Sequence, residues 1–256
     1  DRAAGVNMEF AQHAFENRMQ NLKNIVIGNG IVSIPDSTFS GCRALKNVII
    51  PDSVETIGNG AFYYCTSLEE MVIPDSVKTY GTYIFHNCTS LKRVTLSKNA
   101  SVLSDGMFAG CVDLEEVIIP DNVEEYGFDA GAKECYIFYE CKALKKVVLS
   151  KTAKIIPAGM FSRCISLKDI TIPEGITTIE YNAFYNISPE ANLFIPDSVA
   201  TIGDATRLPQ CKVTMPCRFA LENGLHRREG YSFYHMNGEN DHDEDNCTVC
   251  RRTGKC

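Results

Sequence analysis

The chain has 256 residues, 45% of them hydrophobic, and a formal net charge of −7 at pH 7. This length and hydrophobic content allow a sizeable core, and no apolar run approaches the ~18 residues of a membrane-spanning helix, so we expect no membrane insertion. The negative charge argues against a nucleic-acid partner, because such a partner requires a basic patch that neutralises phosphates. No basic and then apolar leader follows Asp1, so we expect that any signal peptide has been removed or is not included.

The first residues are predicted to close one end of a repeat structure. Ala14 and Phe15 match a pattern that recurs later in the chain, and Leu22 follows them with one extra residue of spacing. A stack of repeats needs an atypical first unit that covers its open core. We therefore expect residues 1–24 to form an N-terminal capping coil that is partly helical.

A cysteine then recurs every 23 residues, at Cys42, Cys65, Cys88 and Cys111. A period of 20 to 50 residues is typical of a solenoid, in which each repeat packs against its neighbours. Two other residue types keep the same period, phenylalanine at Phe15, Phe39, Phe62, Phe85, Phe108, Phe138, Phe161 and Phe184, and leucine at Leu22, Leu45, Leu68, Leu91, Leu114, Leu144 and Leu167. These columns predict one continuous stacked core over residues 25–216.

Each repeat is predicted to contribute one short strand. The alternation in Val48-Ile49-Ile50 and Val94-Thr95-Leu96 has a period of two and is rich in β-branched residues. Proline follows most of these segments, and turn-forming pairs such as Asp52-Ser53 follow the proline. We count nine such strands, from 25–27 to 213–215, and expect them to stack as a parallel sheet.

The middle residues of these segments are predicted to point outward and to form an exposed ladder. They are Val26, Ile49, Val72, Thr95, Ile118, Val148, Thr171 and Phe194. A large exposed apolar patch often marks an interaction surface, although β-branched residues also suit the outside of a strand on packing grounds alone. If a protein or glycan partner docks, we expect it to contact this ladder from Ile49 to Phe194.

Charges beside the ladder change sign from one repeat to the next. They run Lys46, Glu69-Glu70, Lys92-Arg93, Glu115-Glu116 and Lys145-Lys146. Because neighbouring strands lie about 4.8 Å apart, opposite charges on adjacent strands are expected to pair across the sheet. Such pairing would leave no field of one sign to steer a charged partner.

The chain contains twelve cysteines, a number that by itself suggests a disulfide scaffold. Six of them occupy the repeated core column, namely Cys42, Cys65, Cys88, Cys111, Cys141 and Cys164. Stacked identical positions point the same way and suit a disulfide poorly, whereas a free cysteine packs as a small hydrophobe. We therefore expect buried, reduced thiols in this column.

The period breaks in two places. Between Cys111 and Cys141 the spacing grows to 30, which places a seven-residue insertion near 128–136, either a tolerated surface loop or a binding loop away from the strands. After residue 203 the pattern frays, and residues 217–236 are predicted to form a C-terminal cap in which 217–225 is a short helix stopped by glycine.

Residues 237–256 form an acidic, cysteine-rich tail. His242, Cys247, Cys250 and Cys256 could supply the four ligands of a structural zinc site, although the spacing is compact for one. A disulfide within the tail, one to Cys211 or Cys217, and a disordered linker with incidental cysteines are the alternatives. Apart from this possible zinc, no cofactor is expected.

The sequence does not predict an enzyme. The metalloprotease, P-loop and nucleophile-elbow patterns are absent, and the five histidines are scattered. His86, between Phe85 and Cys88, is interpreted as filling a variable position of the repeat. Adjacent carboxylates such as Glu69-Glu70 recur with the repeat and are matched by basic neighbours, which is not the environment of a general acid.

Over about residues 10–216 the chain resembles the BspA-like leucine-rich repeat family, also called the Treponema type. The resemblance is carried by the 23-residue period together with the A-F-x-x-C-x-x-L segment, as at Ala61, Phe62, Cys65 and Leu68, and by the I-P-x-x-V corner that follows. It implies an α/β repeat, an arc-shaped right-handed solenoid of about eight to nine coils with a parallel sheet on its concave face.

The resemblance also implies function. It predicts a non-catalytic module at the cell surface or outside the cell. We expect this module to recognise a protein or glycan through the concave sheet, as an adhesin does, and to be a monomer. A structural spacer that displays a neighbouring domain is the alternative, and a metal-binding or cross-linking role of the tail is a third reading.

Overall fold

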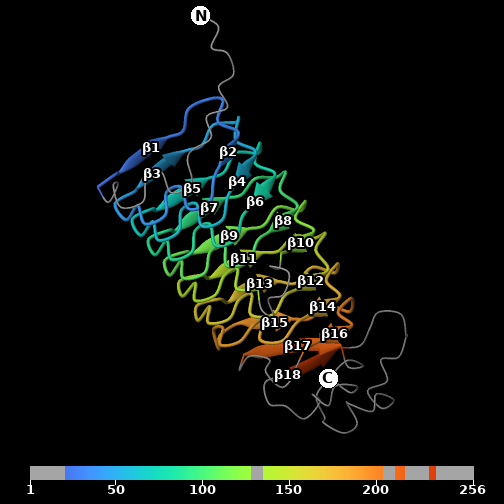
Figure 1. Cartoon of the computed structure of the whole chain (residues 1–256). Helices are drawn as coiled ribbons and strands as arrows, with labels where there is room; N and C mark the ends of the chain where they lie inside the picture. The colour runs from blue at the N-terminus through green and yellow to red at the C-terminus, as the bar shows by residue number, and fades with distance from the viewer. Residues whose placement is uncertain (1–20, 128–134, 204–210, 217–230, 235–256) are drawn as a thin grey trace, which may run out of the picture.

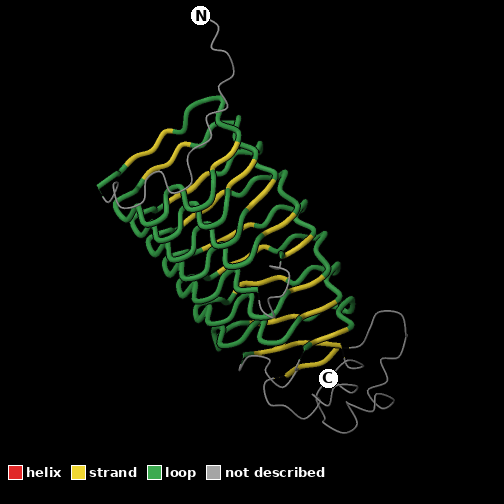
Figure 2. Tube along the Cα trace, viewed as in Figure 1, coloured by secondary structure: helices red, strands yellow, loops and turns green. Residues whose placement is uncertain are grey.

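The computed structural model describes residues 21–127, 135–203, 211–216 and 231–234. Over these residues the chain forms a solenoid whose coils stack along one axis, with strands on two sides and turns between them (Figures 1 and 2). Each coil up to residue 202 contributes one strand of three residues and one of two. Several predicted segments lie outside the described residues. They are residues 1–20 of the N-terminal cap, residues 128–134 of the insertion, and all of the predicted C-terminal cap and tail except 231–234.

The first series of strands confirms the predicted sheet. Its members start one residue earlier than the sequence pattern suggested. They form three hydrogen-bonded groups, within which neighbours are parallel, with Ile25 opposite Val48 and Val147 opposite Ile170. The series is β1 (Asn24–Val26), β3 (Asn47–Ile49), β5 (Glu70–Val72), β7 (Arg93–Thr95), β9 (Glu116–Ile118), β11 (Lys146–Val148), β13 (Asp169–Thr171), β15 (Asn192–Phe194) and β17 (Lys212–Pro216). A further strand, β18 (Tyr231–Tyr234), pairs in parallel with β17.

A second series of strands follows the proline corners, and the sequence analysis missed it. Its members are β2 (Ser33–Ile34), β4 (Thr56–Ile57), β6 (Thr79–Tyr80), β8 (Val102–Leu103), β10 (Glu125–Tyr126), β12 (Ile155–Ile156), β14 (Thr178–Ile179) and β16 (Thr201–Ile202). The corner after Pro51 is closed by the Val54 amide donating to its carbonyl at 3.1 Å. Two residues are too few for a period of two to stand out in a sequence.

The α/β assignment is wrong over the part of the chain that the structure describes, where no helix occurs. In most of the segments before the column cysteines, two positions take a positive φ, for example Gly60 (56°) and Tyr64 (58°), and Tyr83 (56°) and Asn87 (58°). Left-handed residues break a right-handed helix, because the chain reverses its twist at each of them. The segments therefore form successive turns, and the handedness and curvature of the solenoid stay predictions.

The predicted phenylalanine column forms a continuous stack from Phe39 to Phe184. Successive rings lie 5.3–5.7 Å apart and nearly parallel, at 22° between the first two and at 10° or less after them. The leucine column from Leu45 to Leu167 is fully buried beside it. Because offset parallel rings combine apolar burial with favourable ring contacts, this stack ties every coil to its neighbours.

The insertion does not interrupt this core. Phe108 and Phe138 flank it in the stack and still lie 5.6 Å apart, and Glu116 of β9 stays opposite Lys146 of β11. The base of the insertion is closed by the Cys135 thiol, which donates to the Gly127 carbonyl at 3.1 Å. The strand register is therefore the same on both sides of the insertion.

The cysteine column is buried as predicted, and each thiol has a defined partner. From Cys65 to Cys164, the five thiols of the column donate to the carbonyl of a phenylalanine in the preceding coil, over 3.0–3.2 Å. These cysteines are not joined in disulfides, and burial raises the pKa of the Cys42 thiol to about 12. The column thus serves both packing and backbone satisfaction.

Candidate functional site

The outward side of the first strand series is the surface that the sequence analysis selected, and we call it the sheet face. It consists of the first and third residues of each strand from β1 to β15, since the middle residue points into the core. This alternation follows from the pleat of a β-strand, which turns successive side chains to opposite sides. The sheet face is therefore fixed by the same pattern that builds the core.

The third residues form the predicted ladder, and all of its members are exposed. Val26 is 72% exposed, Val72 64% and Phe194 48%, and Thr95 and Thr171 are exposed as well. Register pairing places them next to one another: Val26 opposite Ile49, Val72 opposite Thr95, and Val148 between Ile118 and Thr171. The structure thus brings Ile49, Val72, Thr95, Ile118, Val148, Thr171 and Phe194 into one row on one side of the molecule.

The charged rows beside the ladder pair in part as the sequence predicted, because the ion pairs join a basic pair to the glutamates of the coil before it. Glu69 lies 3.5 Å from Lys92, and Glu70 lies 3.6 Å from Arg93 in the next coil. The same arrangement recurs one coil pair later, where Lys145 and Lys146 lie 3.5 Å and 2.7 Å from glutamates of the preceding coil. Contact with Glu116 raises the pKa of Lys146, as expected for an ammonium held against a carboxylate.

At the N-terminal end of the sheet face the first residues of the strands are the asparagines Asn24 and Asn47, next to the exposed Lys23 and Lys46. The Asn47 side-chain amide donates to the side-chain oxygen of Asn24 at 2.7 Å, directly across β3 and β1. At the other end Lys168 pairs with Glu190, which lowers the pKa of that carboxyl. Many of the charges on this face are therefore paired with charges of the neighbouring coil. The apolar ladder beside them is exposed.

The predicted zinc ligands His242, Cys247, Cys250 and Cys256 lie outside the described residues, and the zinc site stays a prediction. Among the residues that are described, no group of three or more histidine, cysteine or acidic side chains is arranged to hold a metal ion. In the same part of the chain, no helix has the length and apolar character of a membrane span.

The sequence analysis missed a second surface feature. A hollow of about 380 Å³ opens beside the second strand series, near β2, β4 and β6, and His86, interpreted as a filler of the repeat, is part of its lining. Its aromatic lining comes from two consecutive coils, with Tyr63 in one and Tyr83 and His86 in the next. The sequence does contain a signal for this hollow. The positions that hold aromatic rings in these two coils hold only small residues, Ser37 and Ser40, in the coil before them and Gly106 and Ala109 in the coil after them.

The sequence model of one protein family, the BspA-type leucine-rich repeat region, matches residues 8–135 and 132–240 of this chain, with six copies of the repeat. The chain belongs to the BspA-type leucine-rich repeat family. The resemblance read from the A-F-x-x-C-x-x-L segment is thereby confirmed for nearly the whole chain.

Solved structures of leucine-rich repeat proteins are similar to this chain. A leucine-rich repeat protein from Eubacterium ventriosum is 28% identical with a TM-score of 0.57, and the match covers 65% of this chain and 43% of that one. A leucine-rich repeat protein of T. pallidum is 24% identical with a TM-score of 0.54, covering 83% and 86%. A leucine-rich cell surface protein from Faecalibacterium prausnitzii is 25% identical with a TM-score of 0.42, covering 88% and 62%.

The chain thus spans less than half of the E. ventriosum protein. A search of curated proteins found no match. The comparisons identify the repeat family and the fold, and they assign no partner to the sheet face.

Proposed function

We propose that this chain is a non-catalytic binding module that recognises a protein partner through the apolar ladder of the sheet face. The observation that carries the proposal is the exposed row from Val26 to Phe194, which lies on three successive groups of hydrogen-bonded parallel strands, β1–β3, β5–β13 and β15–β18. With strands about 4.8 Å apart, its eight residues extend over roughly 34 Å. A contiguous apolar surface of this kind on a folded domain is typical of a protein interaction site.

The chemistry of the row favours a protein over a glycan. Its side chains are mainly aliphatic and β-branched, and such groups bury well against apolar side chains but offer a sugar neither ring faces nor hydrogen bonds. The flanking charges are engaged with each other, as in the pairs Glu69–Lys92 and Glu70–Arg93. A partner with an apolar strip flanked by uncharged polar groups would therefore fit this face.

A catalytic role has little support in the described residues. The thiols that could act as nucleophiles are buried, and burial raises the pKa of Cys88 and Cys211, the latter to about 11. A protonated, buried thiol is inert, because the thiolate is the reactive form. Display at the cell surface or outside the cell is the localisation that the family resemblance implies, and it belongs to this proposal.

A spacer that holds a neighbouring domain away from the cell is the second candidate. The paired charges of the sheet face favour it, because a surface that neutralises itself needs no partner. The two candidates differ in one respect: a spacer tolerates charged substitutions in the ladder, whereas a binding module does not.

The test compares two triple variants of the full chain. The first carries Ile49→Asp, Val72→Asp and Ile118→Asp on the sheet face. The second carries Val32→Asp, Ile155→Asp and Ile165→Asp, which are also exposed aliphatic residues but lie off that face. Proteins captured from cell-surface and matrix extracts are identified by mass spectrometry, purified, and titrated against the three chains by biolayer interferometry.

A purified protein that binds the parent chain and the second variant equally, but the first variant at least tenfold more weakly, supports the proposal. Equal binding by all three chains, or no protein that binds the parent directly, supports the spacer instead. Circular dichroism of both variants shows whether the solenoid is intact, and the second variant controls for the added negative charge.

A further inference from the structure

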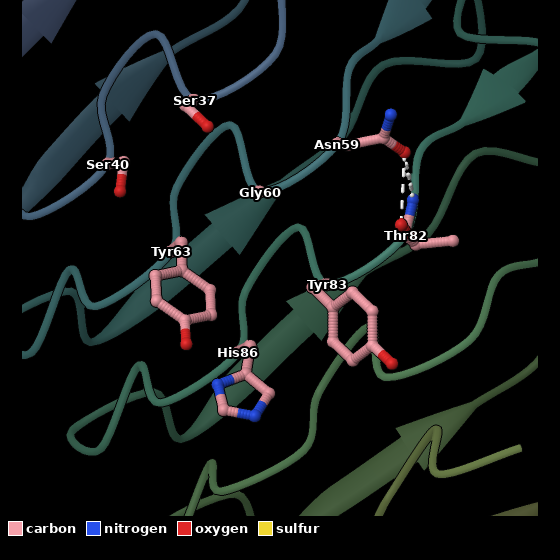
Figure 3. A pocket seen from close by; sticks show the side chains of 8 residues that line it. All are labelled: Ser37, Ser40, Asn59, Gly60, Tyr63, Thr82, Tyr83 and His86. Atoms are coloured by element: carbon pink, nitrogen blue, oxygen red, sulfur yellow. Dashed lines mark hydrogen bonds between the residues drawn. The ribbon is translucent and has the colours of Figure 1, made fainter.

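The hollow near β2, β4 and β6 is built from two positions of the repeat. One lies two residues before the stacked phenylalanine and the other lies one residue after it. In three successive coils these positions hold Ser37 and Ser40, then Gly60 and Tyr63, then Tyr83 and His86. The small residues of the first two coils open the space, and the rings of the second and third coils border it, as Figure 3 shows.

The rings form an ordered aromatic wall. Tyr63 and His86 are stacked, with centroids 4.9 Å apart and planes inclined by 16°. Tyr83 stands at 68° to the His86 ring, 5.7 Å away, so a face and an edge meet at one corner of the hollow (Figure 3). The neighbouring Asn87 fixes the imidazole further, because its side-chain amide lies 2.9 Å from His86 Nδ1.

This wall is neutral at physiological pH. Burial lowers the pKa of His86, and the carboxylate of Asp105 offsets this effect only in part. The Asn87 amide is a donor, so Nδ1 accepts from it and the imidazole proton is assigned to Nε2. The wall therefore offers uncharged ring faces with hydroxyl and N–H groups at their rims.

Polar groups lie opposite the rings and are already oriented. The Asn59 side-chain oxygen accepts from the Thr82 amide at 2.8 Å and from its hydroxyl at 3.1 Å, and the Asn59 amide donates to Asp36 at 3.1 Å. A side-chain amide has two hydrogens, so one remains for a ligand after the bond to Asp36. The hydroxyls of Ser37 and Ser40 add groups that can donate or accept.

The charge around the hollow selects among ligands. Among the described residues no Lys or Arg lines it, and the charged groups bonded to its lining are the carboxylates Asp36 and Asp105. An anionic ligand would meet repulsion there without a compensating cation. A quaternary ammonium prefers a cage of several ring faces. Here Tyr63 and His86 are stacked on one another, so fewer ring faces are available to a ligand than in such a cage.

We propose that this hollow binds a neutral pyranose unit of a glycan. The apolar C–H face of the sugar would lie on the aromatic wall, and its hydroxyls would bond Asn59, Ser37 and Ser40. The volume of about 380 Å³ is near the lower end of the range of small-ligand pockets, which suits a single sugar unit. This site lies beside the second strand series and does not rest on the function proposed for the sheet face.

The repeat itself supplies variants that are compatible with the fold. The position of Ser40 holds tyrosine in other coils, at Tyr63, Tyr139 and Tyr185. Ser40→Tyr therefore fills the hollow with a residue that this position accepts. Tyr63→Ala removes part of the wall, and Tyr185→Ala is the matched control, because Tyr185 occupies the same repeat position and is 47% exposed.

The experiment is saturation-transfer NMR on the full chain with methyl glycosides of glucose, galactose, mannose and N-acetylglucosamine. The expected result is transfer to the C–H face of at least one sugar, with affinity reduced at least tenfold in Ser40→Tyr and in Tyr63→Ala. Binding should be unchanged in Tyr185→Ala and in the Ile49→Asp, Val72→Asp, Ile118→Asp variant.

Several results would overturn the proposal. They are no transfer to any of the four sugars, and sugar binding that both hollow variants retain. A change in the chemical shifts of the His86 and Tyr63 rings on adding tetramethylammonium, but not on adding the sugars, would also exclude a sugar site. Failure here leaves the sheet-face titration untouched, because the two experiments use different variants and different ligands.

Discussion

The ring of Tyr83 lies directly over Gly106 of the next coil. A Cβ placed on Gly106 would stand 2.2 Å from Cδ1 and Cε1 of the tyrosine ring, well inside van der Waals contact. The Tyr83 hydroxyl donates to the Asp105 carboxylate at 2.9 Å, so the ring is held at both ends. The glycine therefore sets the position of one wall of the hollow.

Replacing this glycine is expected to destabilise the protein in two ways. Gly106→Ala would meet the Tyr83 ring and would also hold alanine at a φ of 60°. The control, Gly60→Ala, has nearly the same φ of 56° but meets its nearest atom at 3.5 Å. We expect a loss of about 1–2 kcal/mol from the backbone in both variants and a further loss in Gly106→Ala alone.

Urea denaturation followed by circular dichroism gives both values. Tyr83→Ala in the background of Gly106→Ala should recover the part of the loss due to the clash and leave the part due to φ. Equal free energies of unfolding for the two glycine variants would contradict the contact between Tyr83 and Gly106.

The phenylalanine stack is expected to carry much of the stability. Phe85 is fully buried between Phe62 and Phe108, at ring distances of 5.5 and 5.7 Å. Phe85→Ala should lower the free energy of unfolding by about 3–5 kcal/mol, from lost burial and a cavity that rigid neighbours cannot fill. Ile118→Ala, at a site 59% exposed, should change it by less than about 0.5 kcal/mol.

The buried thiols predict a loss of stability at alkaline pH. Burial raises the pKa of Cys42 to about 12, whereas an unfolded thiol titrates at about 8.5. Above the unfolded value the unfolded chain releases a proton that the folded chain keeps, so this contribution is complete below about pH 8.5 and is lost as pH rises toward 12. Urea midpoints from pH 7 to 10.5 should fall less steeply for Cys42→Ala than for the parent chain.

Iodoacetamide labelling provides a second measurement on the same thiols. At pH 8 peptide mapping should find Cys65, Cys88 and Cys111 unmodified in the folded protein and fully modified in urea. Labelling of these positions without denaturant would contradict the burial of the column, because a buried, protonated thiol does not react.

The ion pairs of the sheet face are expected to contribute little. Glu70 and Arg93 are both well exposed and 3.6 Å apart. A double-mutant cycle with Glu70→Gln and Arg93→Gln should give a coupling of about 0.2–1 kcal/mol at low salt. It should shrink in 1 M NaCl, where the screening length is about 3 Å; a coupling that is independent of salt would point to packing of the Arg93 stem instead.

Much of the architecture could be read from the sequence because identical positions repeat. The columns of Phe62 and Cys65 and the exposed Ile49 follow from period and alternation, and all three were placed correctly. Pairing of Glu69 with Lys92 also followed, since strands of one parallel sheet in equal register bring equal positions together. In these cases a position in the repeat determines its environment.

What could not be predicted depends on geometry within a coil. The strand Thr56–Ile57 has only two residues, too short for a pattern, and the turns around Tyr83 and Asn87 take a positive φ that nothing in those residue types announces. The hollow arises from this combination: tyrosine and histidine in one coil, and glycine or serine in coils beside it. The hollow thus depends on residues that differ from one repeat to the next, and a consensus of the repeats does not contain them.

The alternation of sign along the charged rows constrains how such a chain can lengthen or shorten. Loss of the single coil that carries Lys92-Arg93 would place Glu69-Glu70 against Glu115-Glu116, four carboxylates in one patch. Loss of two consecutive coils would instead bring Glu69-Glu70 against Lys145-Lys146 and restore attraction. Over this stretch, duplication or deletion in pairs of coils preserves the charge pattern, so the repeating unit of the charged surface is two coils, twice the structural unit.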